Sequence, residues 1–350
     1  PWAHCGADLW RGSLARIFGA DLWRGSLGRI FGVSFIALRG VPDNSDMSDI
    51  APYQPLRPSR SAFVPVRGWR YHVHEWGNPQ SISAERPLLV LLHGWMDVGA
   101  SFQFVVDALQ ADRFIIAPDW RGFGKTEGPI TDSYWFPDYY ADLEALLDHY
   151  SPQQAVDLLG HSMGGNVVMG YAGARPARIR RLINLEGFGM PKTVGAMAPG
   201  RLAQWLDELK QPQTFSDYAD LSAVAARLRK NNPLLSADKA AWLAPHWARP
   251  TATGRWEVQG DPAHKRVNPT LYRVDEHMAL WQRITAPLLW VQGDQTDTDA
   301  WWKGRYTLQE FQERLQHVPQ VESHTLGPSG HMIHHDQPQA LAALLEGFLG

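Results

Sequence analysis

The stretch "DLLGHSMGGNVV", residues 157–168, decides the fold of this chain. Residues 155–159 are mostly apolar and predict a short buried strand, while the residues from Asn166 onward predict a helix. Ser162 therefore lies on a very short turn between a strand and a helix. The glycines on both sides of it allow the backbone to bend sharply and let strand and helix pack closely. The pattern Gly-x-Ser-x-Gly in this setting is typical of a turn that presents a serine hydroxyl at the carboxyl end of a sheet.

Glycine-rich turns between a strand and a helix also have other uses. They bind phosphate groups, and a serine within one sometimes serves only as a helix cap. The motif alone leaves these interpretations open. A nucleophilic serine needs a base, an acid that orients the base, and N–H donors for an oxyanion, so the rest of the chain decides between them.

The composition is that of a globular protein. With 350 residues the chain is long enough to bury a large core. A formal net charge of −3 argues against a nucleic-acid-binding protein, which usually has a basic face. The only cysteine is Cys5, which excludes an intramolecular disulfide and a thiolate metal cluster. No apolar run approaches the ~20 residues of a membrane span, and we expect a cytoplasmic protein.

The first part of the chain contains a tandem repeat, "ADLWRGSLARIFG" (7–19) followed by "ADLWRGSLGRIFG" (20–32). Two short copies are too few for a solenoid. The first methionine is Met47. We expect the native protein to start near this residue, and residues 1–46 to be a non-native or disordered leader with no part in the function.

Short, continuously apolar runs recur through the rest of the chain and predict buried strands of a mostly parallel sheet. They lie at 88–94, 114–120, 155–160, 182–187 and 287–293, with weaker ones at 70–77 and 321–327. Helix-like segments between them predict an α/β fold with helices on both faces of the sheet. About a hundred residues without a clear strand separate 182–187 from 287–293. A structureless loop of this length is improbable, so we expect a helical cap there.

A base and an acid for Ser162 are found late in the chain. His331, on a glycine-rich loop after the last predicted strand, is the candidate base. Asp294 and Asp297 directly follow strand 287–293, and Glu186 ends strand 182–187, so that spacing leaves all three open as the acid.

Other histidines of the chain are candidates for metal ligands. The string His331, His334, His335 and Asp336 lacks a third ligand at a familiar spacing, and we expect no metal site there. His72 and His74 alternate on one predicted strand and are expected to be ordinary surface histidines.

The expected oxyanion donors are the backbone N–H groups of Met163, which follows the serine, and Trp95, on the loop after strand 88–92. A second set of side chains is expected to contact an apolar substrate, two from the same loop and two from the cap. These are His93, Met96, Trp205 and Trp242.

With these residues in hand, the chain resembles the α/β-hydrolase superfamily over residues 62 to 350. The resemblance depends on "LLHGW" (91–95), "DWRGFGKT" (119–126), "GHSMGG" (160–165), the late aspartates and "HMIHHDQP" (331–338), in the order Ser, Asp, His. It implies an eight-stranded sheet with a core of 62–187 and 286–350, and a cap at 188–285. It also favours Asp297 over Asp294 as the acid, although some dehalogenase-like relatives use the position of Glu186.

Within the superfamily the sequence is most similar to the serine-hydrolase-like, esterase-type branch. We therefore expect hydrolysis of a carboxylic ester of an apolar or aromatic small molecule through an acyl-enzyme, without a cofactor or metal ion. Two alternatives stay open. One is hydrolysis of a carbon–carbon bond in an aromatic ring-cleavage product, with Arg273 or Lys265 binding a carboxylate. The other is a non-catalytic ligand-binding relative. "GFGKT" lacks the first glycine of a phosphate-binding loop, with Asp119 at that position, which excludes an NTPase.

Overall fold

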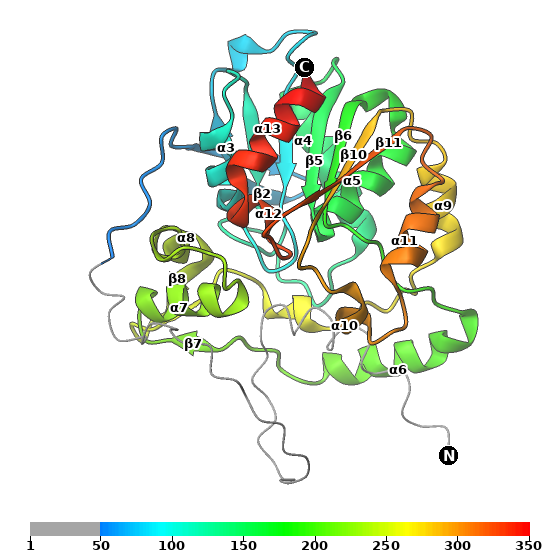
Figure 1. The fold of residues 1–350 in the computed structure, drawn as a ribbon. Coiled ribbons are helices and arrows are strands. Elements are labelled where there is room, and N and C mark those ends of the chain that lie inside the picture. Colours follow the sequence, from blue (N-terminus) through cyan, green and yellow to red (C-terminus); the bar gives the residue numbers. More distant parts are fainter. Residues whose placement is uncertain (1–49) are drawn as a thin grey trace, which may run out of the picture.

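The computed structural model describes residues 50–350 (Figure 1). The predicted leader at 1–46 lies outside the described residues, so that expectation stays a prediction. None of the helices within 50–350 is long and apolar enough to cross a membrane.

Eight strands form the central sheet, in the order β1-β2-β4-β3-β5-β6-β10-β11. Their bounds are β1 Arg60–Val66, β2 Trp69–Trp76, β3 Leu89–Leu92, β4 Ile115–Pro118, β5 Val156–His161, β6 Ile179–Leu185, β10 Leu288–Gly293 and β11 Val321–Leu326. The first two strands pair antiparallel with their neighbours, and the six from β4 to β11 run parallel. The predicted mostly parallel, eight-stranded sheet is therefore confirmed. β1, which forms a hairpin with β2, is not among the predicted strands, because several of its residues are exposed and interrupt the apolar pattern.

The strands are buried because helices cover both faces of the sheet. Within β3, Leu89 and Leu91 point to one face, while Val90 and Leu92 point to the other. The first face packs against α3 (Gln103–Ala108) and α13 (Pro338–Leu349). The opposite face packs against α4 (Phe136–Tyr150), α5 (Met163–Ala174), α9 (Val274–Trp281) and α11 (Leu308–Leu315). Burial on both faces explains why these strands read as continuous apolar runs.

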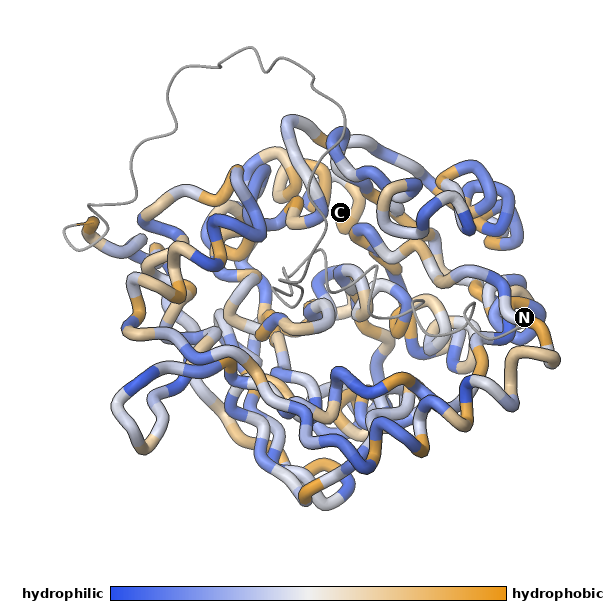
Figure 2. Tube along the Cα trace, turned by 90° about the horizontal axis from the view of Figure 1, so that it is seen from below, coloured by the Kyte–Doolittle hydropathy of each residue, from blue (hydrophilic) through white to orange (hydrophobic). Residues whose placement is uncertain are grey.

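The long insertion between β6 and β10 lies mainly at one end of the sheet (Figure 1). It contains α6 (Ala198–Leu209), α7 (Leu221–Asn231) and α8 (Ala237–Trp247), which agree with the helix-like pieces of the sequence. The insertion also contains short strands, which the expectation of a helical cap did not include. β7 (Asp217–Tyr218), β8 (Ala248–Pro250) and β9 (Trp256–Val258) form a small antiparallel sheet that joins the helices. Seen from this end, hydrophilic and hydrophobic residues alternate along the insertion (Figure 2).

Candidate active site

Ser162 occupies the predicted turn, between the last residue of β5 and the first residue of α5. Its backbone angles, φ 54° and ψ −113°, are strained for a residue with a side chain. The Ser162 N–H donates a hydrogen bond of 2.8 Å to the carbonyl of Leu185, at the end of the neighbouring strand β6, which ties the turn to the sheet. A Cβ on Gly160 would lie 2.2 Å from the Gly164 carbonyl oxygen, so only glycine lets strand and helix approach this closely.

The residue paired with His331 is Glu186, the first residue after β6. Its Oε2 lies 3.0 Å from His331 Nδ1. The carboxylate is buried and also accepts hydrogen bonds from the Gly293 N–H at 2.6 Å and the Thr296 hydroxyl at 2.9 Å. Because a carboxylate accepts, His331 Nδ1 donates the proton, and Nε2 is left as the basic nitrogen.

The preference for Asp297 as the partner of His331 is therefore wrong. Asp297 caps α10 (Thr298–Trp302) by accepting a hydrogen bond from the Ala300 N–H at 2.9 Å. Asp294 accepts instead from the Ser329 N–H at 2.8 Å. β6 and β10 are neighbours in the sheet, so acids at both strand ends come close to the histidine loop. By spacing the sequence did not distinguish Glu186 from the two aspartates, because each acid directly follows a buried strand or lies in the turn after it.

The two residues whose backbone N–H groups are expected to bind an oxyanion lie beside the serine. Met163 is the first residue of α5, and the first N–H groups of a helix have no acceptor within it. The loop that carries Trp95 passes directly beside Ser162, since a Cβ on Gly94 would lie 3.1 Å from the serine Cβ. The two residues expected to donate to an oxyanion, Trp95 and Met163, both line the pocket together with the serine.

A pocket of about 350 Å³ opens over Ser162, Glu186 and His331. Aromatic side chains form a large part of its walls, and the ring of Trp301 meets that of His331 edge to face, with centroids 4.8 Å apart. The other aromatic side chains of the lining are Trp95, Tyr134, Trp135, Phe136, Tyr139, Tyr140, Phe188, Tyr272 and Trp302. This environment suits an apolar or aromatic ligand.

The four expected substrate contacts do not line this pocket. His93 is buried and accepts a hydrogen bond from the Trp120 N–H through Nε2. The carbonyl of Met96 accepts from the indole of Trp247. Trp205 donates to the Ser133 hydroxyl at 2.9 Å. Trp242 packs on Phe104, with ring centroids 5.6 Å apart, and is therefore a packing residue.

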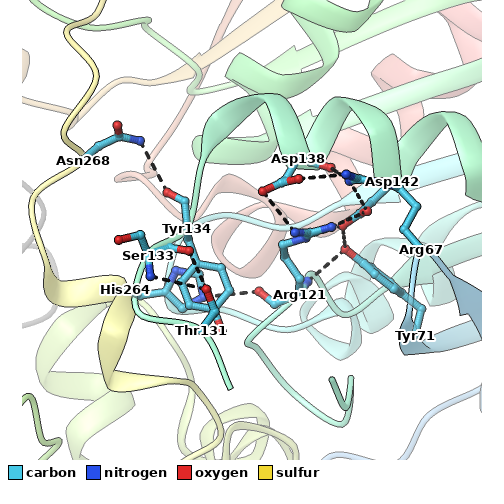
Figure 3. A network of polar contacts seen from close by, with 10 residues as sticks. All are labelled: Arg67, Tyr71, Arg121, Thr131, Ser133, Tyr134, Asp138, Asp142, His264 and Asn268. Carbon is cyan, nitrogen blue, oxygen red and sulfur yellow. Dashed lines mark hydrogen bonds and ion pairs between the residues drawn. The ribbon is translucent and has the colours of Figure 1, made fainter. Parts of the chain in front are cut away.

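One wall of the pocket is fastened to the core through a polar network (Figure 3). His264 of the insertion is stacked between Phe123 and Tyr134, at centroid distances of 3.9 and 3.6 Å. Its Nε2 lies 3.2 Å from the Arg121 carbonyl oxygen. Burial lowers the pKa of His264 to about 3, so the ring is neutral.

The Arg121 side chain also holds this wall of the pocket in place. Its guanidinium donates to both carboxylate oxygens of Asp142, one at 2.6 Å, and lies 3.1 Å from Asp138. Tyr71 also donates to Asp142. The loop that follows β4 is thereby held by α4 (Figure 3).

Three histidines that were not expected to belong to the active site, His72, His74 and His161, are buried. The expectation that His72 and His74 are surface histidines is wrong, since their exposed fractions are 0% and 5%. β2 lies inside the sheet, between β1 and β4, and both of its faces are covered. His161, the residue before the serine, holds the backbone carbonyl of His331 through Nε2 at 2.8 Å. Burial, with smaller contributions from His334 and His331, holds the pKa of His161 well below its ordinary value.

Comparison with known proteins agrees with this fold. Residues 87–338 match the family described as the alpha/beta hydrolase fold. The 3-hydroxybutyrate-oligomer hydrolase of Cupriavidus necator is 31% identical over 268 residues, covering 74% of this chain and 86% of the relative. The cis-3-alkyl-4-alkyloxetan-2-one decarboxylase of Shewanella oneidensis is 26% identical over 305 residues, 84% of this chain and 89% of the relative.

Among solved structures, the thioesterase domain from the curacin biosynthetic pathway superposes with a TM-score of 0.70 at 24% identity. The match covers 82% of this chain and 99% of that domain, and it shows the shared fold. The chain belongs to the α/β-hydrolase superfamily. Family membership and these relatives support hydrolase activity.

Proposed function

We propose that this protein is a serine hydrolase that cleaves carboxylic esters of apolar or aromatic small molecules. The observation that carries the proposal is that Ser162, on its strained turn, and the His331–Glu186 pair face one pocket. A serine, a histidine and a buried acid are the groups that acyl transfer requires. The ester bonds implied by the name of the 3-hydroxybutyrate-oligomer hydrolase support this class of substrate.

The proposed reaction begins with a proton transfer. His331 Nε2 takes the proton of the Ser162 hydroxyl, whose oxygen then attacks the ester carbonyl. The buried carboxylate of Glu186 stabilises the imidazolium that forms and keeps the ring in the correct tautomer. The N–H groups of Met163 and Trp95 donate to the oxyanion, and one such donor is worth roughly 3–4 kcal/mol.

The second half of the reaction releases the acid. The alcohol leaves with the proton from His331, and the acyl group remains on Ser162. A water molecule, deprotonated by the same histidine, then hydrolyses the acyl-enzyme by the reverse sequence of steps.

Hydrolysis of carbon–carbon bonds is the second candidate, because cations line the pocket. Arg201 and Arg266 both belong to the lining and are suited to a carboxylate-bearing substrate. Of the two cations expected from the sequence, Arg273 also lines the pocket and is ion-paired with Asp275 at 2.9 Å. Lys265 does not belong to the lining and donates to the Thr214 carbonyl. The 2-hydroxy-6-oxo-2,4-heptadienoate hydrolase of Pseudomonas putida is 34% identical, but over 116 residues.

Hydrolysis of p-nitrophenyl esters of increasing acyl length tests the proposal. We expect turnover by the wild-type protein and none above background by Ser162→Ala. Ser216→Ala, which alters an exposed serine of the insertion, serves as the matched control. Turnover of a ring-cleavage product without turnover of any ester would favour the second candidate. Tight binding of either compound without turnover would favour a ligand-binding protein.

A further inference from the structure

A second cluster of polar side chains is buried beside the proposed active site. Asp97 follows β3, His161 ends β5, and His334 lies in α12 (Ile333–Asp336). Their exposed fractions are 5%, 1% and 0%. One ligand atom from each of the three residues lies within 4.8 Å of the other two. None of the three lines the pocket over Ser162, so this cluster is a separate feature.

The atoms that face one another in this cluster lack partners. Asp97 Oδ2, His161 Nδ1 and both ring nitrogens of His334 make no hydrogen bond within the described part of the chain. Asp97 Oδ2 and His334 Nε2 lie 3.8 Å apart, which is too long for a hydrogen bond. A buried polar atom without a partner costs about 1–3 kcal/mol. A bound group that satisfies several of them at once therefore stabilises the fold.

The hydrogen bonds around the cluster fix the kind of group. His161 Nε2 donates to the His331 carbonyl, so its proton is on that nitrogen and Nδ1 presents a lone pair. Asp97 Oδ1 accepts from the Ser101 hydroxyl, and Oδ2 presents further lone pairs. Two electron-pair donors thus face the same buried space.

We propose that Asp97, His161 and His334 bind one divalent transition-metal ion of the zinc type. Imidazole nitrogen combined with one carboxylate suits Zn²⁺, Co²⁺ or Fe²⁺, whereas Mg²⁺ and Ca²⁺ prefer oxygen ligands. With metal–ligand distances of about 2.0–2.2 Å and tetrahedral geometry, two ligand atoms of one ion lie about 3.4 Å apart. Asp97 Oδ2 and His334 Nε2, at 3.8 Å, are already near this separation. A pair of atoms at the 4.8 Å limit has to draw together by about 1.4 Å.

The fold provides the ligands that the sequence pattern lacked. His334 belongs to the histidine string 331–336, which has no third ligand at a familiar spacing. Asp97 comes from the loop after β3 and His161 from the end of β5, and both meet His334 at the end of the sheet. A cavity of about 30 Å³ lies beside Asp97 and is also lined by Ser101 and His335.

A second histidine cluster of similar composition shows the difference between a structural network and an ion site. In that cluster Asp119 Oδ2 accepts from His72 at 2.8 Å and from the Lys125 N–H, while Oδ1 accepts from the Gly99 N–H. Its histidines are also bonded to serine hydroxyls, at 2.6 and 2.9 Å. The polar atoms there satisfy one another, so we propose no ion in that cluster.

An ion at this site would connect the loop after β3, the end of β5 and α12, and would do so independently of the reaction proposed for Ser162. His161 connects the ion site with the proposed active site, because it precedes Ser162 and donates a hydrogen bond to the His331 carbonyl. The expected consequence is a more stable arrangement of the loops rather than a part in the chemistry.

Co²⁺ titration of the full chain, stripped with a chelator, tests the proposal. We expect one equivalent to bind with visible d–d absorption of histidine-ligated Co²⁺, and the thermal midpoint to rise by several degrees. Asp97→Asn and His334→Gln should each lose this equivalent and the rise in thermal midpoint. His324→Gln, which removes an exposed histidine paired with Glu322, should keep both and serves as the control.

The wild-type measurement alone is decisive even if a variant folds poorly. Absence of both the absorption and the thermal shift at excess Co²⁺ overturns the proposal, and a water molecule then occupies the cluster. Binding that both variants retain at the wild-type stoichiometry also overturns it, because the ion is then held elsewhere.

Discussion

The Glu186 carboxylate lies 3.0 Å from Nδ1 of His331, although 145 residues separate them in the chain. Because β6 and β10 are adjacent, the acid at the end of β6 reaches the loop after β11 across the end of β10. The same carboxylate accepts two further hydrogen bonds, from Gly293 and Thr296, which fix its orientation. In the proposed mechanism, Glu186 is therefore the residue that determines the tautomer of His331.

Replacing the acid should therefore lower turnover strongly. We expect Glu186→Gln to lower kcat by about a thousandfold to ten-thousandfold, because an amide stabilises the imidazolium poorly and permits the wrong tautomer. KM for a p-nitrophenyl ester should change little. Steady-state kinetics on the two variants Glu186→Gln and Asp297→Asn measure the contrast.

Asp297→Asn is the matched control for that experiment. Asn also caps helices well, so stability should change by less than about 1 kcal/mol and kcat by only a few-fold. A large loss of kcat in Asp297→Asn with normal turnover by Glu186→Gln would contradict the assignment.

The glycines around the serine should tolerate no side chain. A Cβ on Gly164 would lie 2.2 Å from the Leu92 carbonyl oxygen, so we expect Gly164→Ala to lower the free energy of unfolding by about 3 kcal/mol or more. Gly347→Ala in α13 meets open space and should raise it by about 0.5–1 kcal/mol. Urea denaturation monitored by circular dichroism compares the two. Equal effects would mean that the turn is less tightly packed than described.

Acid should destabilise the protein partly through His264. Its pKa is about 3 in the folded protein and about 6.5 when unfolded, so the unfolded chain binds an extra proton between these values. Its contribution to stability is complete above pH 6.5 and is lost as the pH falls toward 3. Between pH 6.5 and 5 the loss is about 2 kcal/mol for this residue.

His264→Gln is the variant that measures this contribution. Its stability should depend less steeply on pH than that of the wild type between pH 6.5 and 5, whatever its stability at pH 7. Urea midpoints at several pH values give the slopes. Parallel slopes for the two proteins would show that His264 is protonated to the same extent in both states.

The aromatic wall should determine the preference for apolar esters. We expect Trp301→Ala to lower kcat/KM for a long-chain or aromatic ester by roughly tenfold, because its ring packs against His331 and lines the pocket. Trp205→Ala, which alters a tryptophan outside the lining, should change this ratio by less than about threefold. A larger effect at Trp205 would place the substrate over α6 instead.

The sequence predicted the fold and the serine turn because both depend on local patterns. Continuous apolar runs report burial on both faces of the sheet, and the glycines around Ser162 report a close approach of backbones. The acid and the substrate contacts depend on which strand ends and which side chains meet across the fold. Glu186, Asp294 and Asp297 are equivalent by spacing, and only the hydrogen bond of the folded chain distinguishes them.

For the same reason, the tryptophans of the sequence predict the lining of the pocket less well than the local patterns predict the fold. Trp205 and Trp242 are apolar and lie in the insertion, as an expected substrate contact should. Each of them instead contacts the body of the protein, while Trp301, on the helix after β10, faces the serine site. Side-chain direction within a cap is set by tertiary packing, which a single sequence does not contain.

The most direct test of the central claim is the mass of the acylated protein. Wild-type protein quenched with acid during turnover of p-nitrophenyl butyrate should carry one butyryl group, and peptide mapping should locate it on Ser162. Ser162→Ala should carry none and should turn over no ester. A butyryl group on another residue, or undiminished turnover by Ser162→Ala, would contradict the account.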